Sequence, residues 1–287
     1  MSRLPTYFLS HGGGPWPWMK AQTGTTFNKL EVSLQAIARD IGAQINAVLI
    51  ISGHWEENAF TLSSSPHPSM IYDYSGFPEH TYHIQYPAPG SPELAHRVLT
   101  MLKAAGVPAA LDPYRGFDHG TFSVMGATFP AADVPIVQMS LKSNLDPRAH
   151  LEVGRLLAPL RDEGVLIIGS GLSYHNLRSF GPSAKAPSRA FDLWLQRILV
   201  ASSPQERNHQ LVHWEAAPSA RLAHPREDHL LPLMVVAGAA QDDPGHCVYH
   251  EDDFFGAICV SSFRFGGLPA SERDNPKTLP ARSSNSL

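Results

Sequence analysis

The chain has little of several features that mark particular classes of protein. Only two of its 287 residues are cysteines, Cys247 and Cys259. This excludes a disulfide framework, and a thiolate zinc site needs more cysteines than this. No apolar run approaches the roughly 18 residues of a membrane span, and the first segment, MSRLPTYFLSHGGG, lacks the apolar core of a signal peptide. We therefore expect a cytoplasmic protein with two buried free thiols and no membrane association.

Long runs of one charge sign are also missing. The formal net charge of −4 is spread along the chain, so nucleic acid is not an expected partner. Hydrophobic residues make up 43% and charged residues 17%, which is typical of a globular chain and not of a disordered one. Histidine, in contrast, is abundant, with fifteen copies. Histidine is the commonest metal ligand and the usual proton carrier near neutral pH, so this excess directs attention to both kinds of chemistry.

Short apolar runs alternate with segments of helical periodicity. The apolar runs are typical of strands covered on both faces, and they cover Thr6–Leu9, Ala47–Ile51, Pro135–Leu141 and Val165–Ile168. The segments between and after them predict helices within residues 26–42, 91–106, 146–164 and 189–201, with Ser91 and Asp146 as N-caps of the second and third. This alternation predicts a layered α/β fold with a central, largely parallel or mixed sheet flanked by helices. We expect a single domain over residues 1–265, followed by a loose tail over residues 266–287.

Residues 58–90 have a different composition, with many proline, serine, tyrosine and histidine residues. We expect a long ordered excursion with an edge strand at Tyr82–Tyr86. Such loops often cover active sites. The excursion is either a lid or a subunit contact, so the possibility of a homo-oligomer stays open.

Three of the strand-like runs are followed by a histidine, namely His11, His54 and His175. In open α/β sheets, ligands bind beyond the carboxyl ends of the strands. If these strands are parallel, the three side chains gather on one rim. A single histidine beside a strand end is more often a hydrogen-bonded structural residue than a ligand. Three of them together favour a functional site.

Two further histidines have informative neighbours. The segment HPREDHLLPLMVVAGAA places His229 in the turn that enters an apolar helix, where we interpret Asp228 as complementing the helix dipole. The segment RGFDHGTF places His119 in a sharp, glycine-flanked loop between a helix and a strand, which supports a functional and a structural role equally. Most other histidines lack such a context. His96 and His150, within predicted helices, are expected to be surface or structural residues.

Five segments occur here in the order seen in a known family. They are LSHGGGP, ISGHWE, FDHGTF, IGSGLSYHNL and HPREDHLLPL, and they span residues 9–233. In this arrangement the chain resembles the class III extradiol ring-cleaving dioxygenases, and most of all the 4,5-DOPA dioxygenase extradiol-like branch. The resemblance implies a LigB-like α/β fold, a non-haem divalent metal, and opening of a catechol ring with dioxygen to a muconic semialdehyde.

Carried over residue by residue, the resemblance makes His11, His54 and His229 the metal ligands. It makes His175 the acid/base catalyst, or a fourth ligand as in some members. It places His119 as a second-sphere histidine near the substrate and dioxygen. Catalysis is thereby assigned to His175 and His119.

The chain departs from one branch of this family at the metal site. The protocatechuate-cleaving branch completes its site with a carboxylate, whereas the matching segment here offers His229, with Glu227 two residues earlier. Fe(II) is the expected metal for activity, because ring opening by dioxygen needs a redox change. An all-histidine site also suits Zn(II), as an alternative metal or a crystallographic occupant.

The substrate is specified less closely than the site. Aromatic residues near the motifs either stack on a substrate ring or pack around the rim, and they are Trp16, Trp18, Phe117 and Tyr174. DOPA-like, caffeate-like and simpler catechols all stay open. Two other functions also stay open, a zinc-dependent hydrolase and a non-catalytic binding protein on the same fold, as in the Memo family.

Overall fold

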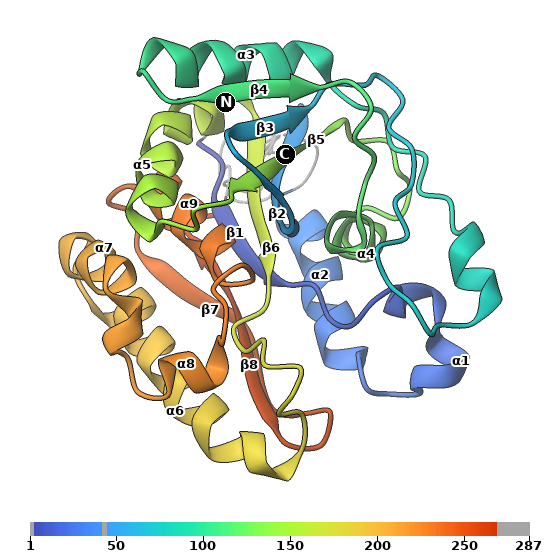
Figure 1. Cartoon of the computed structure of the whole chain (residues 1–287), viewed down its shortest axis with the longest axis vertical. Helices are drawn as coiled ribbons and strands as arrows, with labels where there is room; N and C mark the ends of the chain where they lie inside the picture. The colour runs from blue at the N-terminus through green and yellow to red at the C-terminus, as the bar shows by residue number, and fades with distance from the viewer. Residues whose placement is uncertain (1–2, 42–44, 269–287) are drawn as a thin grey trace, which may run out of the picture.

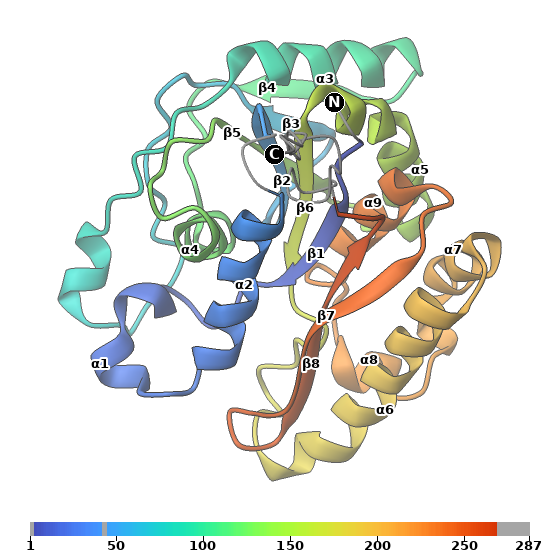
Figure 2. The ribbon, with the colours of Figure 1, turned by 180° about the vertical axis from the view of Figure 1, so that it is seen from behind.

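The strands belong to one mixed sheet, seen in a computed structural model that describes residues 3–41 and 45–268. The order across the sheet is β4-β3-β5-β2-β6-β1-β8-β7 (Figures 1 and 2). The strands are β1 (Thr6–Ser10), β2 (Ala47–Glu57), β3 (Phe60–Ser63), β4 (Ala109–Asp112), β5 (Ile136–Lys142), β6 (Val165–Gly171), β7 (Gly245–Phe254) and β8 (Ile258–Phe265).

Helices connect most of these strands. The α-helices are α1 (Lys20–Thr23), α2 (Asn28–Ile41), α3 (Pro92–Ala104), α4 (His119–Thr128), α5 (Pro147–Leu157), α6 (Lys185–Gln196), α7 (Pro204–Val212), α8 (Ala220–Ala223) and α9 (Leu231–Ala240). Shorter 3-10 turns are η1 (Trp16–Trp18), η2 (Glu79–His83), η3 (Ala158–Glu163), η4 (Pro182–Ala184) and η6 (Trp214–Ala216), and η5 (Arg197–Ala201) is a π-helical turn. In the described part of the chain, no helix is both long enough and apolar enough to cross a membrane.

The centre of the sheet consists of four parallel strands, β5, β2, β6 and β1. Their register aligns the carboxyl ends: Ser10 pairs with Gly171 across β1 and β6, and Ser52 pairs with Ser170 across β2 and β6. The predicted α/β class with a mixed sheet is therefore confirmed. Any side chain that follows one of these ends lies on the same edge of the sheet.

Two helical layers cover the sheet. The crossovers through α2 and through α5 advance across the sheet in opposite directions. Since such crossovers are right-handed, they place the two helices on opposite faces. Helix α4 packs against α2, and α9 packs against α5 (Figures 1 and 2). Every residue of α9 is buried, as expected of a helix that is apolar all round.

Two predicted helix caps are confirmed, and a predicted edge strand is wrong. Ser91 and Asp146 cap α3 and α5 through side-chain acceptors, as the sequence indicated. The predicted edge strand at Tyr82–Tyr86 does not form, and η2 occupies its first part. The residues after η2 run past Pro87 and Pro89, which have no N–H to donate to a sheet. The predicted tail from residue 269 onward lies outside the described residues.

Candidate metal centre

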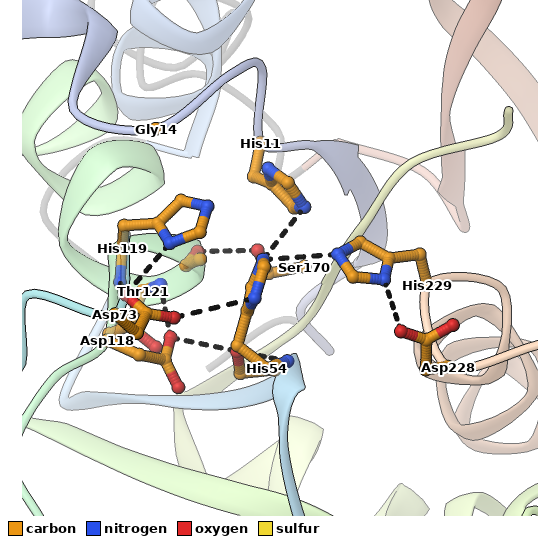
Figure 3. Close-up of polar contacts among 12 residues, drawn as sticks. His11, Gly14, His54, Asp73, Asp118, His119, Thr121, Ser170, Asp228 and His229 are labelled. Carbon is orange, nitrogen blue, oxygen red and sulfur yellow. Dashed lines mark hydrogen bonds and ion pairs between the residues drawn. The ribbon is translucent and has the colours of Figure 1, made fainter. Parts of the chain in front are cut away.

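Three histidines from distant parts of the chain converge at the carboxyl edge of the parallel strands. The Nε2 atoms of His54 and His11 lie 3.3 Å apart, and those of His229 and His54 lie 3.1 Å apart (Figure 3). One nitrogen of each ring falls within 4.8 Å of the others. The structure thus brings together the three residues expected to bind a metal.

Backbone contacts hold His11 directly after β1. Its N–H donates to the carbonyl of Gly171 at 3.0 Å, which continues the pairing between β1 and β6. Its own carbonyl accepts a hydrogen bond from Nε1 of Trp16 at 2.8 Å. The buried side chain of Trp16 therefore fixes the position of the His11 backbone. The Nδ1 atom of His11 is buried without a hydrogen-bond partner.

His54 lies inside β2, and not beyond its end as the sequence suggested. The strand continues to Glu57, but its register with β5 shifts between Ile51 and Glu56. This irregularity is a β-bulge, which re-aims side chains locally. The hydroxyl of Ser52 accepts a hydrogen bond from the N–H of His54 at 3.2 Å and so fixes the backbone there.

His229 lies in the turn that leads into α9, as expected. Its carbonyl accepts a hydrogen bond from the N–H of Leu172, just after β6, at 3.1 Å. A Cβ atom on Gly171 would collide with that carbonyl, and one on Gly53 would lie 3.3 Å from the Cα of His229. Gly53 and Gly171 leave room for this turn to approach the sheet closely.

Two carboxylates outside the histidine cluster orient its rings. Asp228 accepts a hydrogen bond from Nδ1 of His229 at 2.9 Å. The interpretation of Asp228 as a helix-dipole residue missed this contact. Asp73 accepts from Nδ1 of His119 at 2.8 Å, and its other oxygen lies 3.4 Å from Nδ1 of His54 (Figure 3). Asp73 belongs to the 58–90 excursion, where sequence reasoning looked for a lid and did not single out this residue.

His119 is the first residue of α4, so the predicted loop at this position is wrong. Asp118 caps the helix by accepting from the N–H of Thr121 at 3.1 Å. The same carboxyl oxygen accepts from the hydroxyl of Ser52 at 2.8 Å. The cap therefore connects the start of α4 to the backbone of β2 beside His54. Burial raises the pKa of Asp118, and the nearby charge of Asp73 adds to the rise.

His175 lies against the three-histidine cluster, and one of its ring nitrogens falls within 4.8 Å of donor atoms of Asp228 and His229. Its ring stacks on that of His229, with a centroid separation of 3.3 Å and an interplanar angle of 14°. Its N–H donates to the carbonyl of Ala223 at 2.9 Å, so α8 holds the segment after β6 in place. Glu227, the carboxylate close to His229 in the sequence, pairs instead with Arg221 at 2.6 Å.

Burial sets the protonation of the cluster. It lowers the pKa values of His11, His54 and His229 well below the ordinary value, and neighbouring imidazoles lower them further. The pKa of His175 falls to about 4, again mainly through burial and then through His119. Burial alone would raise the pKa of Asp73, but the hydrogen bonds and charge of His119 outweigh it and lower the net pKa. At neutral pH the rings of His11, His54, His175 and His229 are therefore uncharged, and each presents one nitrogen lone pair.

The three-histidine set fits a divalent metal ion. Because Nδ1 of His229 donates to Asp228, the Nε2 of that ring carries a lone pair directed at the other two rings. Two nitrogens bound to one ion at about 2.1 Å lie about 3.0 Å apart at a right angle and about 3.4 Å apart at a tetrahedral angle. The observed spacings of 3.1 and 3.3 Å fall in this range. A divalent cation bound between these nitrogens would be held by their lone pairs.

A cavity of about 590 Å³ opens onto the cluster. Its wall includes all five histidines together with Asp73 and several aromatic side chains. The four aromatic residues proposed from the sequence are not part of this wall. Trp16, Phe117 and Tyr174 are buried in the core, and Trp18 packs against Phe122 on another surface. The aromatic side chains that do line the cavity are Phe27, Tyr74, Phe77, Phe180 and Phe255.

Comparison with known proteins agrees with this picture. A family model described as the catalytic LigB subunit of aromatic ring-opening dioxygenase matches residues 5–261. The chain is 36% identical over 264 residues to a 4,5-DOPA dioxygenase extradiol of Beta vulgaris, covering 91% of this chain and 96% of that protein. It is 35% identical over 289 residues to dioxygenase tasH of Hapsidospora irregularis, covering 93% and 87%. The crystal structure of an uncharacterized protein from Escherichia coli K12 matches with a TM-score of 0.75 and 30% identity, over 92% of this chain and 100% of that one.

A mixed sheet with a histidine cluster at the carboxyl edge of its parallel central strands defines an α/β protein with a candidate metal centre. The chain belongs to the LigB family of class III extradiol ring-cleavage dioxygenases, as the five sequence motifs indicated. It is therefore a metal-dependent enzyme of aromatic ring opening.

Proposed function

We propose that the enzyme opens the ring of a catechol with dioxygen to give a muconic semialdehyde, using a metal held by His11, His54 and His229. The observation that carries this proposal is the convergence of three uncharged imidazole nitrogens at 3.1–3.3 Å on the floor of a cavity. Asp228 and Asp73 lie behind two of the rings and fix their orientation, as is usual for carboxylates behind metal-bound histidines.

Fe(II) is the proposed metal. A bound ferrous ion supplies the redox step that makes dioxygen reactive toward the ring, which Zn(II) cannot do because it has no accessible redox change. The neutral donor set leaves the charge of a divalent ion uncompensated by its direct ligands. The carboxylates of Asp73 and Asp228 offset part of that charge from behind the histidines.

His175 is proposed to move the proton. Its imidazole is uncharged at neutral pH because burial lowers its pKa to about 4. An uncharged imidazole at the cavity wall accepts a proton from a catechol hydroxyl as the substrate binds. The stack against His229 keeps the ring beside the three-histidine cluster. The proposed proton acceptor therefore lies in contact with a proposed metal ligand.

His119 is proposed to position the substrate or dioxygen. Its backbone N–H and its Nδ1 both donate to Asp73, at 2.9 and 2.8 Å. Because Nδ1 is engaged by Asp73, Nε2 is left to form a hydrogen bond with a substrate hydroxyl or dioxygen. The proposed substrates are thus an aromatic diol and dioxygen. Cys259 is buried as expected, whereas Cys247 on β7 is exposed, so the prediction of a buried thiol is wrong there. Both thiols are free, which supports action in a reducing compartment, the cytoplasm.

Anaerobic reconstitution with Fe(II), followed by addition of oxygen and a catechol, tests this function. We expect oxygen uptake together with the yellow absorbance of a semialdehyde, and neither signal from protein reconstituted with Zn(II). Metal-dependent hydrolysis without oxygen uptake would identify a zinc hydrolase instead. If neither oxygen uptake nor semialdehyde absorbance is seen across a broad panel of catechols, the proposal is contradicted.

A further inference from the structure

The cavity above the histidine cluster has two chemically different ends. The floor is polar and consists of the five histidines with Asp73. The outer wall is mostly apolar and includes Met19, Phe27, Phe77, Leu177, Phe180 and Phe255. A cavity of about 150 Å³ holds a benzene molecule, whereas this one has about 590 Å³. A catechol ring on the floor therefore leaves room for a substituent that reaches the outer wall.

The few polar groups of the outer wall already have partners. The hydroxyl of Tyr74 donates to the carbonyl of Thr81 at 2.6 Å, and the hydroxyl of Thr23 donates to that of Met19 at 3.0 Å. Within residues 3–41 and 45–268, no lysine or arginine lines the cavity. A carboxylate on the substituent would lose water without gaining a cationic partner, which is costly. The charge of Asp73 on the floor would add repulsion.

Three apolar side chains at the mouth of the cavity are exposed to solvent. Leu177 is 71% exposed, Phe255 is 47% exposed and Phe180 is 36% exposed. The rings of Phe180 and Phe255 lie 5.7 Å apart, and that of Phe255 lies 5.5 Å from Phe27. Leu177 and Phe180 come from the loop after β6, Phe255 from the turn between β7 and β8, and Phe27 from the turn before α2. A contiguous exposed apolar rim assembled from separate segments is typical of a binding site.

The backbone of Phe255 supports the same interpretation. Its φ angle of +51° lies in the left-handed region, which is a genuine outlier for a bulky side chain. The following residue, Gly256, also has a positive φ of +78° and needs no Cβ there. Such strain persists where the surroundings over-determine it, and it clusters at functional sites. The turn thus holds a large phenyl ring over the cavity at a conformational cost.

We propose that the rim of Leu177, Phe180 and Phe255 binds an uncharged, apolar substituent on the catechol, and that the enzyme discriminates against carboxylated and zwitterionic catechols. This inference rests on the proposed function and adds the substrate class to it. The rim is continuous with the histidine floor through Phe27 and Phe77, so one ligand occupies both ends. An amino-acid side chain such as that of DOPA would place two charges against this apolar wall.

A matched pair of substrates tests the inference. 4-Propylcatechol and 3-(3,4-dihydroxyphenyl)propanoate differ only in a terminal methyl group against a carboxylate. We expect kcat/KM of the Fe(II) enzyme to be at least about tenfold higher for 4-propylcatechol than for either the propanoate or unsubstituted catechol, since apolar groups that fill a pocket give discrimination of this size. L-DOPA is expected to resemble the propanoate. Equal or higher kcat/KM for the charged compounds overturns the inference.

Rim variants provide a second, independent readout. Leu177→Arg adds a cation at a highly exposed position, so folding is not at risk. It should raise kcat/KM for the propanoate by about tenfold through a charge-assisted contact, and this gain should vanish at 1 M salt. Phe255→Gly, which relieves the strained backbone, should lower the preference for 4-propylcatechol over catechol. Leu193→Ala, at an exposed leucine of α6 outside the cavity, is the control and should change neither ratio.

The two hypotheses fail in different ways. If no catechol is turned over, the proposed function is wrong, and the inference is then decided by binding alone. Anaerobic calorimetric titration of the metal-loaded protein should give a Kd for 4-propylcatechol at least about tenfold lower than for the propanoate. Equal Kd values, or no effect of Leu177→Arg on their ratio, would overturn the rim proposal even in an active enzyme.

Discussion

The imidazole of His175 lies flat on that of His229, with ring centroids 3.3 Å apart and planes inclined by 14°. Two charged imidazoles do not stack in this way, and burial lowers the pKa of both rings. His175 is thus kept uncharged beside a ring whose Nε2 faces the candidate metal position. The pair therefore places the proposed metal ligand and the proposed base in one stack, and substitutions can separate the two proposed roles.

Replacing His175 with Gln should separate proton transfer from metal binding. The variant removes the basic nitrogen but keeps a polar side chain of similar length. We expect iron content to be unchanged and kcat to fall by about 10²- to 10⁴-fold, the usual contribution of a general base. Metal analysis and oxygen uptake on the same preparation measure both. Normal turnover would show that another group takes the proton.

Replacing His54 with Ala should abolish retention of the metal. Its Nε2 lies between those of His11 and His229, so the substitution removes the central donor of the set. Metal per chain after gel filtration should fall from near one to near zero. The exposed His246 of β7 offers the matched control, and His246→Ala should keep its metal. Unaltered metal content in His54→Ala would remove this residue from the site.

Replacing Asp73 with Asn tests the bridge between His54 and His119. The amide keeps the size of the side chain but loses the charge and one of the two acceptors. Metal affinity should fall by about 10- to 100-fold, as for other residues behind metal-bound histidines. The control is Asp162→Asn. Its side chain is 60% exposed, and its ion pair with Arg3, at 4.0 Å, is long and weak. Equal affinity in both variants would mean that Asp73 has no part in orienting the rings.

Gly171→Ala should disturb the site through the backbone. A Cβ atom at this position would meet the carbonyl oxygen of His229, which the N–H of Leu172 also contacts. Overpacking of this kind costs about 1–3 kcal/mol of unfolding free energy, and the shift of His229 should weaken metal binding as well. Thermal unfolding and metal titration check the two effects. Gly267→Ala, where a Cβ atom meets open space, should change neither.

His150 should make the fold sensitive to acid. It is buried, its Nδ1 donates to the carbonyl of Asp146 at 2.7 Å, and its Nε2 accepts from the N–H of Lys142 at 3.1 Å. Burial lowers its pKa to about 4, whereas the unfolded chain titrates near 6.5. The unfolded state therefore binds the proton first as pH falls. The contribution of neutral His150 to the free energy of unfolding is fully present above pH 6.5. It is lost as the pH falls from 6.5 to about 4, and the loss is at most about 3 kcal/mol.

Denaturant unfolding from pH 7 to pH 4 measures this loss. His150→Gln keeps one donor and one acceptor but does not titrate, so its stability should fall less steeply over this interval. His96→Gln, at an exposed position of α3, is the control and should follow the unmodified protein. Parallel curves for His150→Gln and the unmodified protein would show that His150 is not the acid-sensitive group.

Much of the candidate site could be predicted from local sequence because it follows strand ends. The glycines and histidines after β1 and β6, and the apolar helix after His229, indicate on which edge of a parallel sheet the side chains gather. Helix caps at Ser91 and Asp146 were equally readable, since a cap depends on neighbouring residues alone. The short strands β3 and β4 and the hairpin of β7 and β8 were missed. Their pairing is decided by partners far along the chain, and local propensity carries little of that information.

The sequence by itself determined the chemistry of this protein, through the residue types and their places relative to strands that must be parallel. The tertiary structure decided which carboxylates serve that chemistry. Asp73 meets His119 from 46 residues away, through an excursion with no motif of its own. The apolar rim of Leu177, Phe180 and Phe255 likewise forms only when separate loops are packed together. Both depend on contacts between distant segments, which only the folded chain brings within hydrogen-bond and van der Waals range.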